Sequence, residues 1–411
     1  MTLLRIAFRN VLKNRRRSLI AALAIAFGYM AVCTFKGYTH DSYEQISTGA
    51  IYVESPGHLV IFKQGFLEEG RLDPEKYLFS GAELQRVTRT VRADPDVVWV
   101  APKLSLSGLV TNGAASAVFL ADAMDPADER SLWSFYRGPA DFKRQILPET
   151  PAYAAFIAPK LARVLRLTVG SDAVVMATTQ SGQMNAVDIQ MVGEVSTLSD
   201  ALDDKYLKLP LALARNLYDF DGADRLCVLL SGNDVVPAAR ARLARTLAAD
   251  GSRTEIKSWD ELSVYYQKVK GYLDVVFLFL FTIVLVIVVM GTFNTMSMAV
   301  YERTREVGTL RALGLKRRRV VALFAWEGAL LGVLGSAVGS VLTVAGHLLL
   351  RWAHVTYNPP GIAKDVAIAV DLVPRVFALG FVFFVALSIG SAALPALRAA
   401  RHTIVDALGH V

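Results

Sequence analysis

One ionisable side chain, Glu327, lies inside a long apolar run and is the residue whose surroundings most favour chemistry. The run covers residues 320–350 and has no other Asp, Glu, Lys or Arg. At about 1.5 Å per helical residue it exceeds the roughly 30 Å of a bilayer core. A carboxyl group there is costly unless it has a partner or water. Glu327 therefore either has a functional role or reaches the membrane interface by snorkelling or capping. The sequence leaves both alternatives open.

A charged segment, residues 301–319, directly precedes this run. It holds seven Lys/Arg, which by the positive-inside rule places it on the cytoplasmic side. Helical spacing puts Val307, Leu310 and Leu313 on one face, and Gly314 suits a helix C-cap. Such a helix suits either coupling to a cytoplasmic partner or resting on anionic headgroups. The candidate coupling residues are Glu302, Arg303, Arg305, Glu306, Leu310, Arg311, Leu313 and Gly314.

Four glycines in the apolar run have the spacing of a helix-packing motif. Gly328 and Gly332 form one GxxxG pair, and Gly335 and Gly339 form another. Small residues at this spacing let helix backbones approach closely within a membrane. The contact predicted is either between two copies of the chain or within one chain.

Motifs for catalysis are missing from the sequence. None of the 29 glycines is followed by lysine, so there is no P-loop, and the six histidines lack metal-ligand spacing. The two cysteines, Cys33 and Cys227, fall in different kinds of segment and predict no disulfide. We expect a chain without catalytic residues, metal or bound cofactor.

Composition indicates a chain that is part membrane protein and part soluble domain. Hydrophobic residues make up 53% and the mean hydropathy is +0.38. Residues 39–270 hold 25 basic and 30 acidic residues, so the excess positive charge lies in the flanking segments. Basic charge at membrane edges is explained by orientation and anionic lipid. Nucleic acid is therefore not an expected partner.

Hydropathy and charge together predict four spanning helices with both termini inside. The expected cytoplasmic segments hold fifteen Lys/Arg, against two in the second external loop. A cleaved signal peptide is the alternative for the first apolar run. The predicted segments are an amphipathic cytoplasmic helix at 1–17, spanning helices at 18–38, 271–300, 320–350 and 372–397, an extracytoplasmic domain at 39–270, the coupling segment at 301–319, an external loop at 351–371 and a cytoplasmic tail at 398–411.

The extracytoplasmic domain is expected to be of mixed α/β type. Short β-rich runs alternate with helical stretches, and Pro and Gly punctuation suggests two lobes, one inserted in the other. Strands are predicted at 58–62, 97–100, 174–178 and 187–192. Helices are predicted at 82–92, 159–165, 211–218 and 238–249.

Several stretches resemble the FtsX, MacB and LolE superfamily of ABC transporter permeases. The strongest are ERTREVGTLRALGLKRRRV and WEGALLGVLGSAVG, at residues 302–320 and 326–339. LPALRAARHTIVDAL resembles the ending of the family, RNVLKNRRRSLIAALAIAFG its first helix and GHLVIFKQGF its first external strand. The external domain is most similar to the LolE-type branch, and residues 102–158 contain no recognisable substrate motif.

The resemblance implies a fold of four transmembrane α-helices with a large, MacB-like α/β domain between helices 1 and 2, in the bacterial inner membrane. It implies that two copies of a separate ABC ATPase, which bind ATP and Mg, drive the domain through residues 302–314. It also implies a second permease copy or paralogue, with a periplasmic adaptor or lipoprotein as a further partner. The expected cargo is a lipoprotein, lipid, peptide or other hydrophobic compound. The alternative is a signalling permease that activates an extracytoplasmic cell-wall hydrolase.

Overall fold

Long uninterrupted apolar runs produce the helices that dominate one part of the molecule. The computed structural model describes residues 2–54, 57–70, 73–137, 146–195, 202–357 and 366–399. They fall into two units. The helical unit comprises Met1–Tyr43, Val269–Tyr357 and Ala367–Val411, and the sheet unit comprises Glu44–Lys268 and Asn358–Val366.

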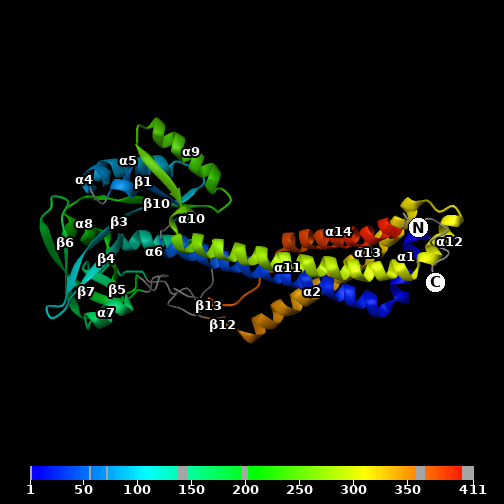
Figure 1. The fold of residues 1–411 in the computed structure, drawn as a ribbon. Coiled ribbons are helices and arrows are strands. Elements are labelled where there is room, and N and C mark those ends of the chain that lie inside the picture. The colour runs from blue at the N-terminus through cyan, green and yellow to red at the C-terminus, as the bar shows by residue number, and fades with distance from the viewer. Residues whose placement is uncertain are drawn as a thin grey trace. The chain divides into compact units, whose positions relative to one another are not determined.

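In the helical unit, four helices of the described chain are long and apolar enough to cross a membrane. They run alongside one another in Figure 1. They are α2 (Arg15–Gly49), α11 (Val264–Glu302), α13 (Arg317–Ala353) and α14 (Pro374–Ala399). The unit also contains α1 (Thr2–Lys13), α12 (Thr304–Ala312) and β12 (Thr356–Tyr357), and β13 (Val366–Ala367) lies at its boundary with the sheet unit.

α2, α11 and α13 are longer than the spanning segments predicted for them, whereas α14 has the predicted length and lies two residues further along the chain. α2 continues to Gly49 and α11 begins at Val264, so both reach into the range predicted for the external domain. Hydropathy detects only the part of a helix that suits lipid, whereas backbone hydrogen bonding continues through polar residues. Of the predicted tail, residues 400–411 lie outside the described part of the chain.

The bundle core is built around aromatic and small side chains of α2. Tyr29 is 1% exposed and lies edge-on to Phe377 and Phe384 of α14. Its hydroxyl donates to the main-chain oxygen of Phe377 at 3.0 Å. Gly28 of α2 leaves room for Val284 and Val288 of α11. The first candidate spanning helix therefore packs centrally among the others.

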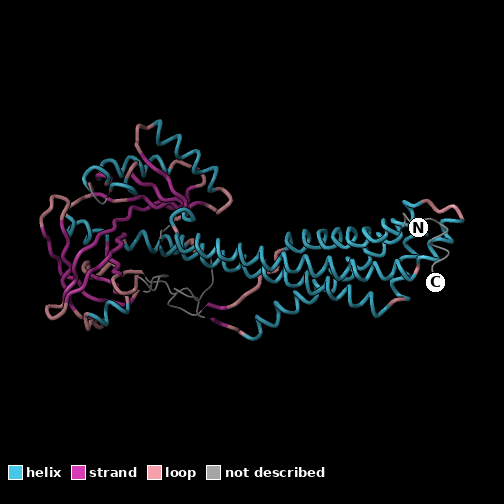
Figure 2. Tube along the Cα trace, in the orientation of Figure 1, coloured by secondary structure: helices cyan, strands magenta, loops and turns pink. Residues whose placement is uncertain are grey.

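The sheet unit contains a nine-stranded mixed sheet (Figure 2). Its strand order is β11-β1-β10-β3-β4-β8-β5-β7-β6, and β6 also pairs with β3. The strands are β1 (Leu59–Lys63), β3 (Val97–Thr111), β4 (Ser116–Met124), β5 (Ala154–Ile157), β6 (Asp172–Thr178), β7 (Met184–Glu194), β8 (Tyr206–Pro210), β10 (Arg225–Leu230) and β11 (Thr254–Ser258). β2 (Phe79–Ser80) and β9 (Gly222–Ala223) form a separate pair.

The long strand β3 joins two lobes, as the Pro and Gly pattern suggested. Residues 97–103 of β3 pair with β10, and residues 104–111 pair with β4. The pairing of β3 with β6 closes strands β3 to β8 into a lobe with its own core, centred on Phe119, Ile157 and Leu161. A second core, around Leu59, Ile61 and Val228, serves the lobe formed by β1, β10 and β11. The β-rich lobe is thus inserted within the other.

Helices cover these cores largely where the sequence predicted them. The structure confirms helices at α5 (Gly81–Arg92), α7 (Pro159–Val164), α8 (Leu211–Tyr218) and α9 (Val236–Ala249), and strands at β1, β3, β6 and β7. The remaining helices are α3 (Phe66–Glu69), α4 (Pro74–Tyr77), α6 (Pro126–Ser134), α10 (Trp259–Leu262) and a π-helical turn at Ala50–Glu54. α5 begins with a capping box in which Ser80 and Glu83 satisfy each other's main-chain N–H groups.

Charged side chains link strands of the two lobes. Lys103 of β3 pairs with Asp122 of β4 at 2.9 Å, and Arg225 of β10 pairs with the same carboxylate at 3.5 Å and with its neighbour Asp224 at 2.9 Å. Burial alone would raise the pKa of Asp122, but the nearby Lys103 and Arg225 outweigh it and hold that pKa at about 2. The Asp122 carboxylate therefore stays ionised near neutral pH.

Candidate coupling site

The coupling segment is a short helix separated from α11 by one residue. α11 ends at Glu302 and α12 begins at Thr304, with Arg303 between them at φ −107° and ψ 13°. Gly314 follows the end of α12, as the predicted C-cap requires, and is left-handed with a φ of +92°. This conformation favours glycine. The segment is thus a separate helical element with defined ends.

One face of α12 packs on the ends of the spanning helices. Val307 is 6% exposed and joins a cluster with Val300, Val320, Phe324 and Ala396. This cluster takes residues from α11, α13 and α14. The buried face of α12 therefore contacts three of the four candidate spanning helices.

The opposite face of the segment is exposed, and here one prediction was wrong. Arg305, Glu306 and Thr309 are exposed. Leu313, which was expected on the same side as Val307, is 80% exposed. The reason is that α12 ends at Ala312 and Leu313 is its C-cap, where the chain leaves the helix. Arg311 is half-buried, and the side chain of Leu310 lies outside the described part of the structure.

Glu327 is buried and forms two charge-assisted hydrogen bonds. Its side chain, 4% exposed, accepts from Arg303 Nη1 on Oε1 at 2.8 Å. The same oxygen accepts from Asn10 Nδ2 of α1 at 2.6 Å. A carboxylate bound by a guanidinium and an amide is stable away from water because both partners offset its lost hydration. Glu327 thus connects α13 to the start of α12 and to α1.

A small cavity with both polar and apolar lining residues adjoins Glu327. Its volume of about 20 Å³ is close to the space needed for one water molecule. Arg17 at its edge pairs with Glu302 at 2.7 Å, but both side chains are over 40% exposed. An exposed pair of this kind adds little to stability. The residues lining the cavity are Asn10, Val11, Asn14, Arg17, Ser18, Thr295, Met296, Ala299 and Glu327.

The four packing glycines all face helices of the same chain. A Cβ on Gly328 would lie 2.6 Å from the Cβ of Ala392, and one on Gly332 would lie 2.9 Å from the Cα of Val385, both in α14. A Cβ on Gly335 would lie 2.7 Å from Ile25, and one on Gly339 would lie 2.6 Å from the main-chain oxygen of Ala26, both in α2. These glycines therefore let α13 pack closely against α2 and α14.

Sequence reasoning did not identify Asn10 as part of this site. It lies 317 residues before Glu327, in a segment for which the sequence predicts only an amphipathic helix. The one usable signal was the expected need of Glu327 for a partner, which does not say where the partner lies. In the structure Asn10 becomes the partner of Glu327 because α1 packs on α13. Ala7 of α1 is fully buried.

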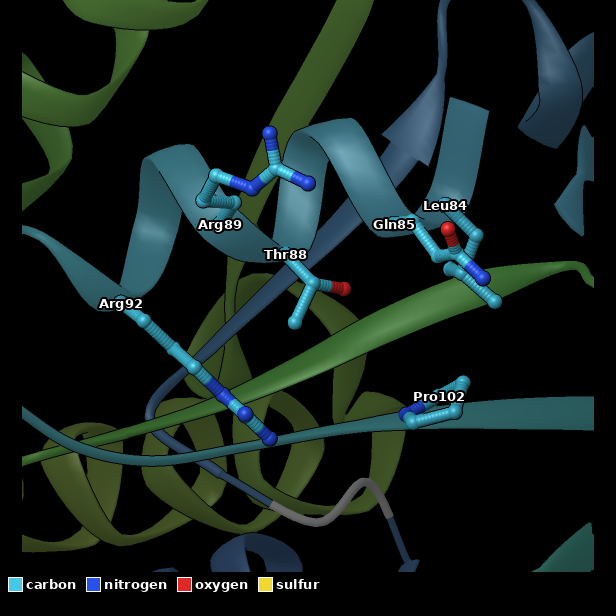
Figure 3. Close-up of a pocket in the computed structure, with 6 residues that line it drawn as sticks. All are labelled: Leu84, Gln85, Thr88, Arg89, Arg92 and Pro102. Carbon is cyan, nitrogen blue, oxygen red and sulfur yellow. The ribbon is translucent and has the colours of Figure 1, made fainter. Parts of the chain in front are cut away.

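The sheet unit has a shallow groove of its own between α5 and β3. Figure 3 shows Arg92 of α5 extending toward the strand that carries Pro102 of β3, whereas the guanidinium of Arg89 points away from that strand. Arg92 Nη2 donates to the main-chain oxygen of Val100 at 3.4 Å, so its guanidinium is held along the strand. Within the described residues, no group of three or more His, Cys, Asp or Glu is arranged to hold a metal ion.

Comparison with known proteins gives a family match in the helical unit. Residues 278–404 match the model "FtsX-like permease C-terminal". An uncharacterized ABC transporter permease, YvrN of Bacillus subtilis, is 22% identical over 98% of both chains. The lipoprotein-releasing system transmembrane protein LolC of Haemophilus influenzae is 28% identical over 30% of each chain.

One solved structure aligns with about half of this chain. The periplasmic region of MacB from Actinobacillus actinomycetemcomitans aligns at 13% identity and a TM-score of 0.33. The alignment covers 52% of this chain and 92% of that chain.

Proposed function

We propose that this chain, an ABC transporter permease with an FtsX-like C-terminal domain, transmits motion from a separate ATPase to its sheet unit. In this proposal the ATPase binds α12, and the helical unit transmits the movement of the ATPase to the sheet unit. The sheet unit then acts on cargo outside the cytoplasm. The permease itself contributes no catalytic residue, and ATP and Mg belong to the partner.

The observation that supports this proposal best is the two-sided character of α12. Its outer face, with Arg305, Glu306 and Thr309, is open to a partner. Its inner face is anchored by Val307 among residues of α11, α13 and α14. A short helix is marginal by itself in water and takes its stability from such packing. A load on α12 is therefore passed to the ends of the spanning helices.

Orientation follows from charge. Lys316 caps the start of α13, Arg317, Arg318 and Arg319 form its first turn, and all four are exposed. Arg15, Arg16 and Arg17 begin α2. By the positive-inside rule we place α12 and both termini in the cytoplasm, and the sheet unit in the periplasm. The membrane is then the bacterial inner membrane.

The proposed assembly contains two ATPase copies and a second permease chain, identical or paralogous. A relative named as a lipoprotein-releasing protein motivates a hydrophobic cargo. We propose export or extraction of a lipoprotein, lipid, peptide or similar compound, with a periplasmic adaptor or lipoprotein as a further partner. Membrane lipids contact the exposed apolar faces of the spanning helices.

The test is ATP hydrolysis by the tagged, full-length chain purified from its native membrane. An ABC ATPase should copurify, and its activity should depend on the permease. Arg305→Glu reverses an exposed charge on α12 and should lower permease-dependent hydrolysis about tenfold, within the usual range of coupling energies. A matched control is Arg163→Glu, an exposed position in the sheet unit, which should leave hydrolysis unchanged.

Two results would count against the proposal. The first is recovery of the chain alone, with no ATPase and no hydrolysis, which would favour a receptor or anchor. The second is an Arg305→Glu protein that inserts normally and stimulates hydrolysis as the wild type does. Copurification of a cell-wall hydrolase without lipoprotein or adaptor would replace transport by signalling.

A further inference from the structure

We propose that Glu327 and Arg303 form a positioning pair that fixes the start of α12 to α13, so that force on α12 moves the spanning helices. This inference rests on the proposed function. It assigns to two buried charges a role in transmission rather than in stability alone. Asn10 extends the same connection to α1.

One member of the pair, Arg303, is the single residue that separates α11 from α12. Its main-chain oxygen accepts from Val307 N at 2.9 Å in the first turn of α12. Its side chain turns inward, is 11% exposed, and reaches Glu327 at 2.8 Å. The backbone of Arg303 thus starts α12 while its guanidinium binds α13.

The pair also differs in kind from the apolar contact of α12. Val307 packs through non-directional contact, which permits sliding and tilting. The bond between guanidinium and carboxylate has a fixed geometry, because the planar donor group must face the acceptor oxygen. Of these two attachments, the Arg303 to Glu327 bond is the one that sets the direction of movement.

Glu327 is well placed to pass that movement on. One residue later, Gly328 meets α14, and Gly335 meets α2 two turns beyond. Ser336, on the same helix, is fully buried. Closely packed helices transmit displacement because interiors have little free volume. The pair therefore lies next to a closely packed part of the bundle.

Asn10 connects the N-terminal helix to the same carboxylate. It donates to Glu327 Oε1 at 2.6 Å, while Ala7, one turn earlier in α1, is fully buried. α1 thus packs against α13 and is hydrogen-bonded to it through Asn10. We infer that α1 moves together with α12 and α13.

The test replaces both charges by apolar side chains, Arg303→Met with Glu327→Leu, in the full-length complex. Removing one partner of a buried pair leaves a stranded charge, whereas replacing both is often neutral for stability. We expect the double variant to insert, bind the ATPase and keep its melting temperature. Permease-dependent ATP hydrolysis should fall about tenfold, in the range of measured coupling energies.

The control is His40→Gln with Asp371→Asn, which removes an exposed pair elsewhere in the helical unit. It should leave hydrolysis unchanged. If the double apolar variant stimulates hydrolysis as the wild type does, the pair is only structural and the inference is overturned. If that variant does not insert, Arg303→Lys replaces it, and full stimulation by the inserted lysine variant overturns the inference instead.

These outcomes separate the inference from the proposed function. A wild-type permease that stimulates no ATPase refutes both. A wild type that stimulates, with Arg305→Glu defective and the double apolar variant normal, refutes the positioning pair alone. A defective double variant with an unchanged melting temperature supports both.

Discussion

Individual buried polar residues in this chain are explained by the partners that the fold provides. Glu327 is stable within an apolar helix because Arg303 and Asn10 donate to it. His58 in the sheet unit differs from Glu327, because this buried titratable group is neutral rather than paired with an opposite charge. Its Nδ1 accepts from the main-chain N–H of Leu230 at 3.1 Å.

His58 predicts a pH dependence of stability. Burial lowers the pKa of His58 to about 4, below the usual value of about 6.5. Between these values the unfolded chain binds a proton that the folded domain does not. Stability is therefore full above about pH 6.5 and falls toward pH 4, by about 2 kcal/mol between pH 7 and pH 5. Thermal melting of the full-length protein in detergent measures this loss.

Two variants isolate the contribution of His58. His58→Gln keeps an acceptor for the Leu230 N–H but does not titrate, so its melting temperature should change less between pH 7 and pH 5. His354→Gln, at an exposed histidine, should follow the wild type. Identical pH profiles for wild type and His58→Gln would show that this imidazole does not remain neutral in the folded state.

At the level of elements, α13 depends on glycine where it crosses α14 and α2. Gly332→Leu would force side-chain atoms toward the Val385 backbone, where even a Cβ lies at 2.9 Å. We expect a destabilisation of about 1 to 3 kcal/mol or more, the usual cost of overpacking. Thermal melting of the purified protein measures it.

Gly346 provides a matched control in the same helix, because nothing lies within 4 Å of a Cβ there. Gly346→Leu should leave the melting temperature near that of the wild type. Equal effects of the two substitutions would mean that the Gly332 contact is not tight in solution. The oligomeric state of Gly332→Leu shows in addition whether a second chain uses this surface.

Elements with a strong local signal were predictable from the sequence, and those set by distant partners were not. α5, α7, α8 and α9 have helical periodicity with local caps or Pro starts, and each lies where predicted. β3 continues to Thr111 through Pro102 and Gly108, because its partner changes from β10 to β4. Likewise, α12 and Gly314 were predictable, whereas the Asn10 bond to Glu327 depends on tertiary packing that no local pattern records.

For the whole molecule, the central claim is that nucleotide binding by an ATPase changes a domain on the far side of the membrane. α2 and α11 each have residues in both units. Transmission through the spanning helices therefore predicts a response in the sheet unit. The response should depend on the Arg303 to Glu327 bond.

The most direct test is hydrogen–deuterium exchange of the complete permease–ATPase complex, with and without ATP, using an ATPase that cannot hydrolyse it. In the wild type, exchange should change in α12 and in strands of the sheet unit. In the Arg303→Met, Glu327→Leu variant, it should change in α12 only. A sheet unit whose exchange is the same with and without ATP in the wild type would contradict the account.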